Sequence, residues 1–482
     1  MTARLLSSTT SELHRRWRTG GGEEEGPRCS SLRLALIVWL VLAAAVSVRT
    51  LVRPNSHTVF PVFAASAKHW WGDHPLYQDD PLLDNFRYPP VFTLFVTPFS
   101  ALGLSVGGIL WNWVSIAVYV AGLWWFVRDV VPSAWTRQRT GVFLILGALG
   151  ALRGLWNAQS NALIVGLLLL GAAELARAVS DRRPQANGRA WWLAALLLAA
   201  AVCLKLTPLA PVLLLVVLWP RRLAWRLAVV SAGFFLLPFL SRPTGIVLDH
   251  YRDWFEHLLE TGDARWLGFR DGWTVWIVLR HLLGVSDEIS FREPIDTSWY
   301  RPLQLATAAA VLLWCLWQQR RASRLGLGPR WLVHVTLSMG LAWLMLFGPA
   351  VEHATYVFLA PPLLWAFLER RAWPHGRGLI LAAFVLIMIL GWGAVSRLLP
   401  AWPVLLTALP AGTALFALWL IGYAFTCGTR IAQPTIPDPR CTEHGSSIAG
   451  IDVRAPLSSW LPGKAAMAWP LDEEWKLPEK KP

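Results

Sequence analysis

The sequence has few charged residues for its length. Only 15% of its 482 residues are Asp, Glu, Lys or Arg, whereas 55% are hydrophobic. This shortage excludes an ordinary soluble domain, in which about a quarter of the residues are charged. Apolar runs of about 20 residues, long enough to cross a hydrocarbon core, recur from residue 32 to about residue 425. These Leu- and Ala-rich runs lack strand alternation, and lipid-exposed backbone must pair with itself, so we expect helices.

Cysteine is also scarce. The five cysteines are scattered, and their spacing matches neither a disulfide framework nor a set of metal ligands. We therefore expect no disulfides, no metal and no cofactor. The first apolar segment lacks a convincing signal-peptide cleavage site, so residues 1–31 are expected to form a polar cytoplasmic tail. Residues 426–482 are rich in proline, charge and small polar residues, which predicts a disordered cytoplasmic tail.

The charge that is present is unbalanced, with 44 basic against 30 acidic residues and a net charge of +14. The basic residues gather in short loops between apolar runs, which is typical of cytoplasmic loops rather than of nucleic-acid binding. These loops are residues 181–189, 221–226, 318–324 and 369–377. If they are cytoplasmic, the segments between them form hairpins whose tips lie outside, at residues 156–161, 203–209 and 348–356.

One region stays open at this point. Its length makes residues 90–127 two membrane crossings and leaves residues 128–139 outside. The three arginines of residues 128–139 favour the inside instead.

The apolar runs predict one all-α polytopic domain over residues 32–425, with about 10–12 transmembrane helices. Polar outer loops are expected at about 53–89 and 243–301. The second loop includes residues 249–260 and 273–283, whose apolar residues recur at three- and four-residue spacing. This spacing predicts amphipathic helices on the outer membrane surface. We expect a multi-pass protein of the plasma (inner) membrane with a polar pocket on its extracytoplasmic side.

The first outer loop ends in the stretch DDPLLDNFRYPPVF. Its two prolines suit the first turn of a helix, where a missing N–H group leaves nothing unpaired. A helix N-terminus with Arg87 beside it suits a phosphate, and Tyr88 stands at the same place. The alternative is that Arg87 meets lipid headgroups and the prolines only start the helix.

Two of the hairpin tips carry polar residues with open alternatives. Asn157, Gln159 and Asn161 offer amides that suit sugar hydroxyls or a phosphate ester, although amides also cap helix ends. Lys205 lies in the middle of an apolar hairpin, where an ammonium group is costly unless it is paired or faces a polar cavity. Its alternative is to reach the outer interface with its long side chain.

The third tip, in VEHATY, sets Glu352 beside His353. A carboxylate and an imidazole in a partly desolvated pocket are candidates for proton transfer or sugar binding. The alternative is that both residues face water at the interface.

The order of these motifs resembles the integral-membrane mannosyltransferases of the GT-C superfamily, specifically glycosyltransferase family 87 (DUF2029-type). The stretches that match best are GDHPLY followed by FRYPPVFTLFVTPFSALGL, then NAQSNALIVGLLLLG, then LKLTPLAPVLLL. The resemblance implies a GT-C-like bundle and a polyprenyl-phosphate-linked sugar, usually mannose, as the sugar donor. It also implies inverting transfer to a lipid or glycan acceptor on the outer face, without a nucleotide sugar.

The sequence departs from the family at two positions. Family members carry an aspartate in a pattern like Asp-x-x-Val-Tyr at the start of the first outer loop, and it is the favoured catalytic base. Here Val59 stands in the place of that acid, and Ala158 replaces the family's glycine in Asn-Gly-Gln. The first departure leaves open a catalytically inactive, glycolipid-binding relative. A membrane transporter is disfavoured, because the sequence shows no internal repeat.

Transfer from a polyprenyl-phosphate sugar needs a group that takes the acceptor's proton and cations that stabilise the leaving phosphate. Arg87 and Lys205 fit the phosphate role. The residues that could replace the family's acid are Asp84, the preferred base, and then Asp79, Asp80, His353 and Glu352.

Overall fold

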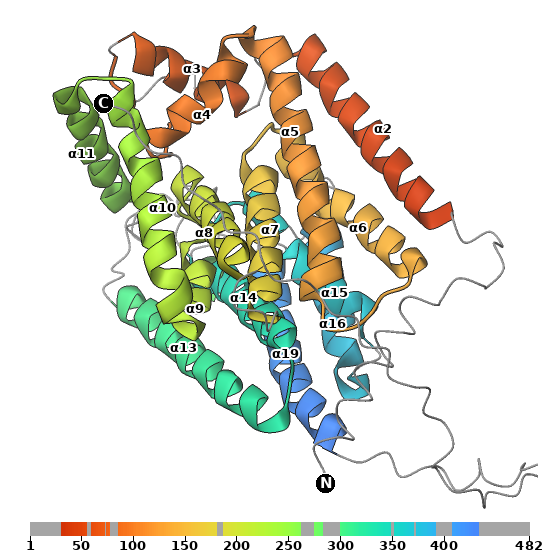
Figure 1. The fold of residues 1–482 in the computed structure, drawn as a ribbon. Helices are drawn as coiled ribbons and strands as arrows, with labels where there is room; N and C mark the ends of the chain where they lie inside the picture. The colour runs from red at the N-terminus through yellow and green to blue at the C-terminus, as the bar shows by residue number, and fades with distance from the viewer. Residues whose placement is uncertain are drawn as a thin grey trace, which may run out of the picture. The chain divides into compact units, whose positions relative to one another are not determined.

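The computed structural model describes residues 30–54, 59–72, 74–77, 85–180, 187–261, 274–282, 299–348, 351–370, 373–391 and 407–432. In this part of the chain the regular structure is helical, without strands (Figure 1). Within the described ranges, seven helices are long and apolar enough to cross a membrane, and four shorter apolar helices accompany them. The all-α polytopic fold is therefore confirmed. Residues 1–29 and 433–482, which make up most of the two expected tails, lie outside the described residues.

The main helices are α2 (Ser30–Val52), α3 (Phe60–Trp71), α4 (Val91–Ser100), α5 (Gly103–Trp125), α6 (Arg137–Trp156), α7 (Asn161–Ser180), α8 (Asn187–Leu204), α9 (Leu209–Leu218), α10 (Trp225–Leu236), α11 (Thr244–Thr261), α12 (Val275–Leu282), α13 (Tyr300–Leu325), α14 (Pro329–Phe347), α15 (Ala360–Leu368), α16 (Arg377–Phe384) and α19 (Ala408–Ala432). Short 3-10 or π segments join several of them: η1 (Phe126–Val130), η2 (Pro220–Ala224), η3 (Leu237–Leu240), η6 (His353–Phe358) and η8 (Val385–Leu390).

Helices α7 and α14 form the centre of the bundle, where most of their residues are buried. Small residues allow the close packing of α7 against α5. A Cβ atom on Gly122 would lie 2.7 Å from the carbonyl oxygen of Gly166, so only glycine fits at this crossing. The apolar core therefore depends on backbone-to-backbone approach as well as on large side chains.

Side-chain contacts join the basic ends of the helices. Glu369 accepts hydrogen bonds from Trp135 and Arg139, and Arg177 pairs with Asp129 at 2.5 Å. We call the helix ends around residues 128–139, 174–177, 218–226, 319–324 and 369 the basic face. Residues 128–139 therefore lie beside Glu369 and the end of α7, on the same face as these basic helix ends, which favours the interpretation drawn from their three arginines.

Helix α4 corrects one expectation. Residues 90–127 do not make two crossings, because α4 has only ten residues and spans about 15 Å, half of a hydrocarbon core. A turn at residues 101–102 follows, and α5 with η1 then runs alone to Val130. The expected helix start after Tyr-Pro-Pro is confirmed, since Pro90 is the residue before α4.

Helix α3 packs against α4 through an aromatic cluster. The rings of Phe63, Phe92 and Trp111 are fully buried, and Phe63 meets Phe92 edge-on with ring centres 4.8 Å apart. These contacts fix α4 beside α5 and hold the segment before it in place. The two expected amphipathic helices are also present, as α11 and α12.

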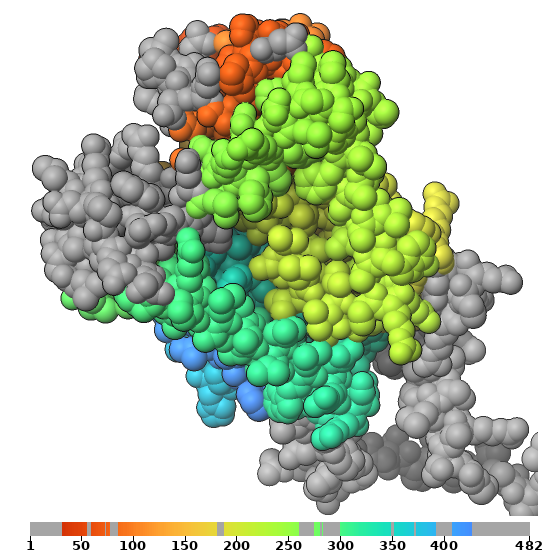
Figure 2. Space-filling model, turned by 90° about the vertical axis from the view of Figure 1, so that its left-hand side faces the viewer, coloured from red at the N-terminus to blue at the C-terminus, as the bar shows by residue number. Residues whose placement is uncertain are grey.

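Helix α10 is the least covered of the candidate membrane spans. In α10 itself no residue is buried, and only 11% of the span's most apolar window is enclosed by protein. Figure 2 shows its yellow-green residues at the surface, with a hollow between them and the teal residues of α13.

Candidate active site

The tip between α6 and α7 is built by an unusual turn. Helix α6 ends where Asn157 and Gln159 donate backbone hydrogen bonds to the carbonyl groups of Arg153 and Gly154, at 3.2 and 2.9 Å. Between them Ala158 takes a left-handed conformation with φ of 51°, the single positive φ of a non-glycine residue in the described ranges. The carbonyl group of Ala158 accepts a hydrogen bond from the indole of Trp111 at 3.0 Å. The tip is therefore rigid, and its amide side chains are held in fixed directions.

Four side chains form a hydrogen-bonded row across three tips. Lys205 donates to Asn161 Oδ1 at 2.8 Å, and Asn161 Nδ2 donates to Gln159 Oε1 at 3.0 Å. Gln159 Nε2 then donates to Glu352 Oε2 at 3.1 Å. We call Lys205, Asn161, Gln159 and Glu352 the polar row. An ammonium group only donates and a carboxylate only accepts, so both amides can take just one orientation.

Tyr88 closes one side of the polar row. Its hydroxyl group lies 2.9 Å from Ser160 Oγ, and its ring centre lies 5.7 Å from Lys205 Nζ. The ring also stacks on Phe92 at 4.3 Å, so the aromatic cluster below α4 positions it. Tyr77 donates to the Tyr88 carbonyl group at 2.8 Å. The cation of Lys205 is therefore bracketed by an amide and an aromatic face.

Glu352 and His353 lie at the start of η6, which follows α14 in the chain. Glu352 begins η6 as its N-cap, and its carboxylate and backbone N–H exchange hydrogen bonds with Thr355. The same carboxylate belongs to the polar row, so this corner is anchored to the α6–α7 tip. A capping box of this kind fixes the chain direction at a helix start.

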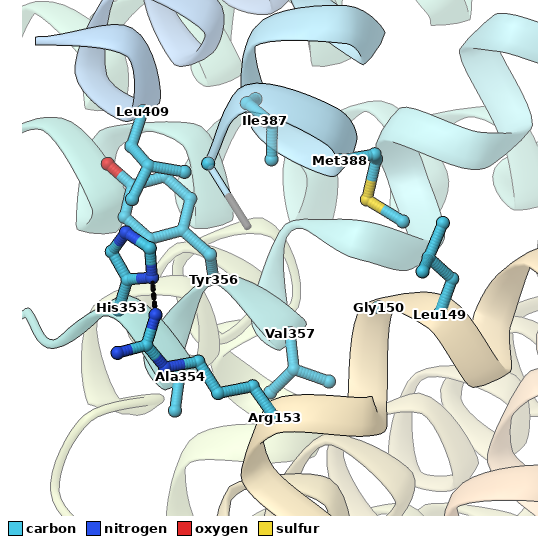
Figure 3. Close-up of a pocket in the computed structure, with 11 residues that line it drawn as sticks. Leu149, Gly150, Arg153, His353, Ala354, Tyr356, Val357, Ile387, Met388 and Leu409 are labelled. Atoms are coloured by element: carbon cyan, nitrogen blue, oxygen red, sulfur yellow. Dashed lines mark hydrogen bonds between the residues drawn. The ribbon is translucent and has the colours of Figure 1, made fainter. Parts of the chain in front are cut away.

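His353 contacts a cation that the sequence analysis did not single out. Its Nδ1 atom is hydrogen-bonded to the guanidinium group of Arg153, in the last turn of α6 (Figure 3). Because a guanidinium group only donates, Nδ1 accepts, and the ring proton resides on Nε2. Burial, together with the charge of Arg153, lowers the pKa of His353 to about 3.

Arg153 and His353 also line a small pocket of about 50 Å³. Apolar side chains of α6, η8 and α19 form its other walls, among them Leu149, Met388 and Leu409 (Figure 3). Pockets that hold drug-sized ligands have volumes of about 300–1,000 Å³. This pocket therefore has room for water but not for a hexose.

Val59, which stands where the family has its acid, lies directly beside the tip. Its backbone N–H donates to the carbonyl group of Asn157 at 2.7 Å. Its side chain packs against the aromatic cluster of α3 and α4. The segment that would carry a catalytic aspartate thus reaches the α6–α7 tip but brings an apolar side chain there.

The structure brings together five of the eleven predicted site residues. Lys205, Asn161, Gln159, Glu352 and Tyr88 meet around the polar row. Asn157 lies in the same tip, but its side chain makes no hydrogen bond to the described residues. Arg87 is exposed and takes no part in the polar row. Asp79, Asp80 and Asp84 lie outside the described residues.

Sequence reasoning missed Arg153 and Ser160. Ser160 belongs to the NAQSN tip, so its position alone could have marked it. Arg153 lies one helical turn before the tip, and i, i+4 spacing puts it on the face of Asn157. Among the described residues no group of three or more His, Cys, Asp or Glu could hold a metal. The absence of a metal or cofactor in the whole protein stays a prediction.

Comparison with solved structures found two crystal structures of ArnT from Cupriavidus metallidurans. The form bound to undecaprenyl phosphate is similar with 15% sequence identity and a TM-score of 0.42, over 83% of this chain and 77% of that chain. The apo form has 15% identity and a TM-score of 0.40, over 82% and 76%. No curated protein sequence matches the chain.

The sequence profile of glycosyltransferase family 87 matches residues 86–345, which is more than half of the chain. The matched range begins just before Tyr88 and contains the tip with Gln159 and Asn161, as well as Lys205. It confirms the resemblance drawn from the motifs. The chain therefore belongs to glycosyltransferase family 87.

Proposed function

We propose that this protein transfers a hexose, with mannose as the expected sugar, from a polyprenyl-phosphate donor to a hydroxyl group of a lipid or glycan acceptor. The proposed site faces the extracytoplasmic side of the plasma membrane, and transfer inverts the anomeric carbon. The observation that carries the proposal is the polar row, which joins a cation near the membrane to a carboxylate at a neighbouring helix tip.

Lys205 has the properties of a group that binds the leaving phosphate. It is partly buried, and the aromatic face of Tyr88 shields its ammonium group. A cation in such a low-dielectric place stabilises developing negative charge far more than one in water. Arg87, exposed before the start of α4, remains a candidate second contact to the phosphate.

Asn161 and Gln159 serve better as positioning residues than as contacts to the sugar. Asn161 is only 1% exposed, and its amide is engaged with Lys205 on one side and Gln159 on the other. The amide of Gln159 is engaged at both ends as well. Asn157, whose side chain is partly exposed, is the amide that suits the sugar hydroxyls.

Glu352 is the described carboxylate that best suits the catalytic base. In the reaction the acceptor hydroxyl group gives its proton to the base while its oxygen bonds to the anomeric carbon. The bond from that carbon to the phosphate oxygen breaks, and polyprenyl phosphate leaves with the electron pair. Asp84, Asp79 and Asp80 stay alternative bases from the segment just before Arg87.

His353 suits the task of a hydrogen-bond donor better than that of a base. Its ring is neutral at physiological pH, because its pKa lies at about 3, and its Nδ1 atom is occupied by Arg153. In this tautomer Nε2 carries the ring proton, and an imidazole N–H group is a donor of the kind that binds a phosphate or sugar oxygen. Together with Arg153 it supplies a second polar wall beside Glu352.

The test of the proposal is sugar transfer by the purified protein from synthetic polyprenyl-phosphate mannose to an extracted lipid acceptor pool. We expect transfer with the lipid-linked donor and none with a nucleotide sugar. Asp84→Asn and Glu352→Gln distinguish the two carboxylates, since only the base variant should lose turnover while still binding the donor. Transfer from a nucleotide sugar alone would overturn the proposal.

A second function is favoured by Val59, whose apolar side chain occupies the position of the family's acid beside the tip. This alternative is a catalytically inactive relative that binds glycolipid. It predicts that the purified protein binds polyprenyl-phosphate mannose but transfers no sugar, whichever hexose the donor carries. The same assay therefore separates the two functions.

A further inference from the structure

The arginines of the basic face fall into two groups. Arg139 pairs with Glu369 at 2.9 Å, and Arg177 pairs with Asp129 and Glu174, each at 2.5 Å. The arginines at the base of α10 differ. In the described part of the chain no carboxylate pairs with Arg221, Arg222 or Arg226. No described carboxylate therefore neutralises the charge of these three arginines.

Tryptophan rings contact two of these guanidinium groups, those of Arg222 and Arg226. The Arg226 group lies 4.4 Å from the ring centre of Trp225 and 5.5 Å from that of Trp192. The two indoles meet edge-on with ring centres 5.0 Å apart. Arg222 lies 5.8 Å from the ring centre of Trp191 in the same way. Stacking orients a guanidinium plane and leaves its edge, which carries the N–H groups, available for an anion.

Arg226 uses only some of its N–H groups in hydrogen bonds to the described residues. Arg226 donates from one terminal nitrogen to the carbonyl group of Arg222 at 2.6 Å, which brings the two arginines onto one side of η2. Its buried Nε–H group has no acceptor in the described chain. A planar guanidinium group with unused N–H donors matches the tetrahedral oxygens of a phosphate.

The site lies at the edge of the membrane rather than in bulk water. Helix α10 is apolar and exposes Val229 and Leu236, and Leu240 at the end of η3 is exposed as well, so lipid is the medium that covers this span. Figure 2 shows this helix on the surface of the molecule. Trp192 and Trp225, which are 38% and 46% exposed, stand at its basic end, where tryptophan usually meets the headgroup layer.

We propose that Arg222 and Arg226, framed by Trp192 and Trp225, bind the phosphate of an anionic phospholipid headgroup. The lipid's acyl chains then lie along the exposed apolar side of α10, which a free phosphate ion could not cover. Bound in this way, the lipid fastens α10 against α8. The site is distant from the polar row, so the proposal stands independently of the sugar-transfer function.

The test compares thermal unfolding of the full-length protein in phosphatidylcholine nanodiscs with and without phosphatidylglycerol. We expect the anionic lipid to raise the melting temperature of the wild type by about 2 °C or more. The double variant Arg222→Gln, Arg226→Gln should lose most of this gain. The matched control Arg320→Gln, Arg324→Gln removes two charges from exposed arginines of the same face and should keep the gain.

Two outcomes would overturn the proposal. One is a double variant that keeps the full stabilisation by phosphatidylglycerol. The other is an equal stabilisation of the wild type by inorganic phosphate in phosphatidylcholine nanodiscs, which would make the ligand a free anion. If the double variant does not fold, a photoactivatable phosphatidylglycerol analogue replaces it, and crosslinks must then fall at residues 187–195 or 221–236 of the wild type. Crosslinks elsewhere contradict the site.

Discussion

Ala158 occupies a conformation that costs most side chains free energy. At φ of 51° a Cβ atom crowds the following carbonyl group, and left-handed residues other than glycine are disfavoured by about 1–2 kcal/mol. Ala158→Gly removes this cost but gains chain entropy in the unfolded state, so we expect a change in unfolding free energy within about 1 kcal/mol. Ala158→Val adds a branched side chain to a site that is 1% exposed, and we expect it to destabilise by about 2 kcal/mol or more.

Chemical denaturation of the two Ala158 variants checks this prediction. The difference between their unfolding free energies matters more than either value alone. Equal destabilisation by glycine and valine would contradict the left-handed turn. Sugar transfer should survive in Ala158→Gly, since the amides of the tip keep their directions.

His353 makes the stability of the folded protein depend on pH. Its pKa is about 6.5 in the unfolded chain and about 3 in the folded one, so only the unfolded chain binds the proton between these values. The contribution of His353 to the free energy of unfolding is therefore constant above about pH 7. This free energy falls as the pH drops through 6.5 toward 3. We expect His353→Gln to flatten this part of a melting-temperature profile between pH 4 and 8. An unchanged slope in the variant would assign the acid sensitivity to other groups.

At the residue scale, the sequence predicted the members of the polar row one by one. A lysine or a cluster of amides inside apolar runs is costly, so such residues mark a site even without coordinates. The sequence could not predict which of these side chains form hydrogen bonds with one another. They come from three separate tips: Asn161 and Gln159 from one, Lys205 from the second and Glu352 from the third. It missed Arg153 because an arginine near a helix end is ordinary in a membrane protein.

At the scale of single elements, the α6–α7 tip separates two kinds of amide. Gln159→Leu breaks the polar row on both sides of residue 159, so we expect kcat to fall by about tenfold or more with little change in donor affinity. Asn157→Ala removes an amide that is outside the polar row, and we expect it to raise KM more than it lowers kcat. Steady-state kinetics with varied sugar donor provides both values. A Gln159 variant that changes only KM would place Gln159 against the sugar instead.

The contact between residues 128–139 and α15 offers a second test at this scale. Arg139 and Glu369 are 37% and 15% exposed at their side chains, so solvent weakens their attraction. We expect a double-mutant cycle with Arg139→Gln and Glu369→Gln to give a coupling free energy of about 0.5–1 kcal/mol. A coupling of zero would mean that this pair does not hold the two segments together.

Helix α4 shows where element prediction from sequence fails. Residues 90–127 contain enough apolar residues for two crossings, and counting them gave the wrong topology. The structure uses ten of those residues to pack on α3 through buried aromatic rings, which hydropathy cannot distinguish from burial in lipid. The positions of the hairpin tips along the chain were predicted correctly, because basic loops bracket each pair of helices.

For the whole molecule, the arrangement of the helices predicts its orientation in the membrane. Helices α6 and α8 begin at the basic face and end at the polar row, whereas α7 runs the opposite way. In a variant whose own cysteines are replaced, we expect Ser133→Cys to react with thiol reagents only from the cytoplasmic side. Asn157→Cys should react only from the outside. Labelling of both positions from one side would contradict the proposed orientation.

The most direct measurement of the central claim is single-turnover sugar transfer from polyprenyl-phosphate mannose by the wild type and by Glu352→Gln. Donor binding is measured on the same preparations. The account predicts that the wild type transfers the sugar, and that Glu352→Gln binds the donor with nearly unchanged affinity but transfers it at least about a hundredfold more slowly. Full activity in Glu352→Gln would contradict the account, because the polar row would then end at a carboxylate that takes no part in the reaction.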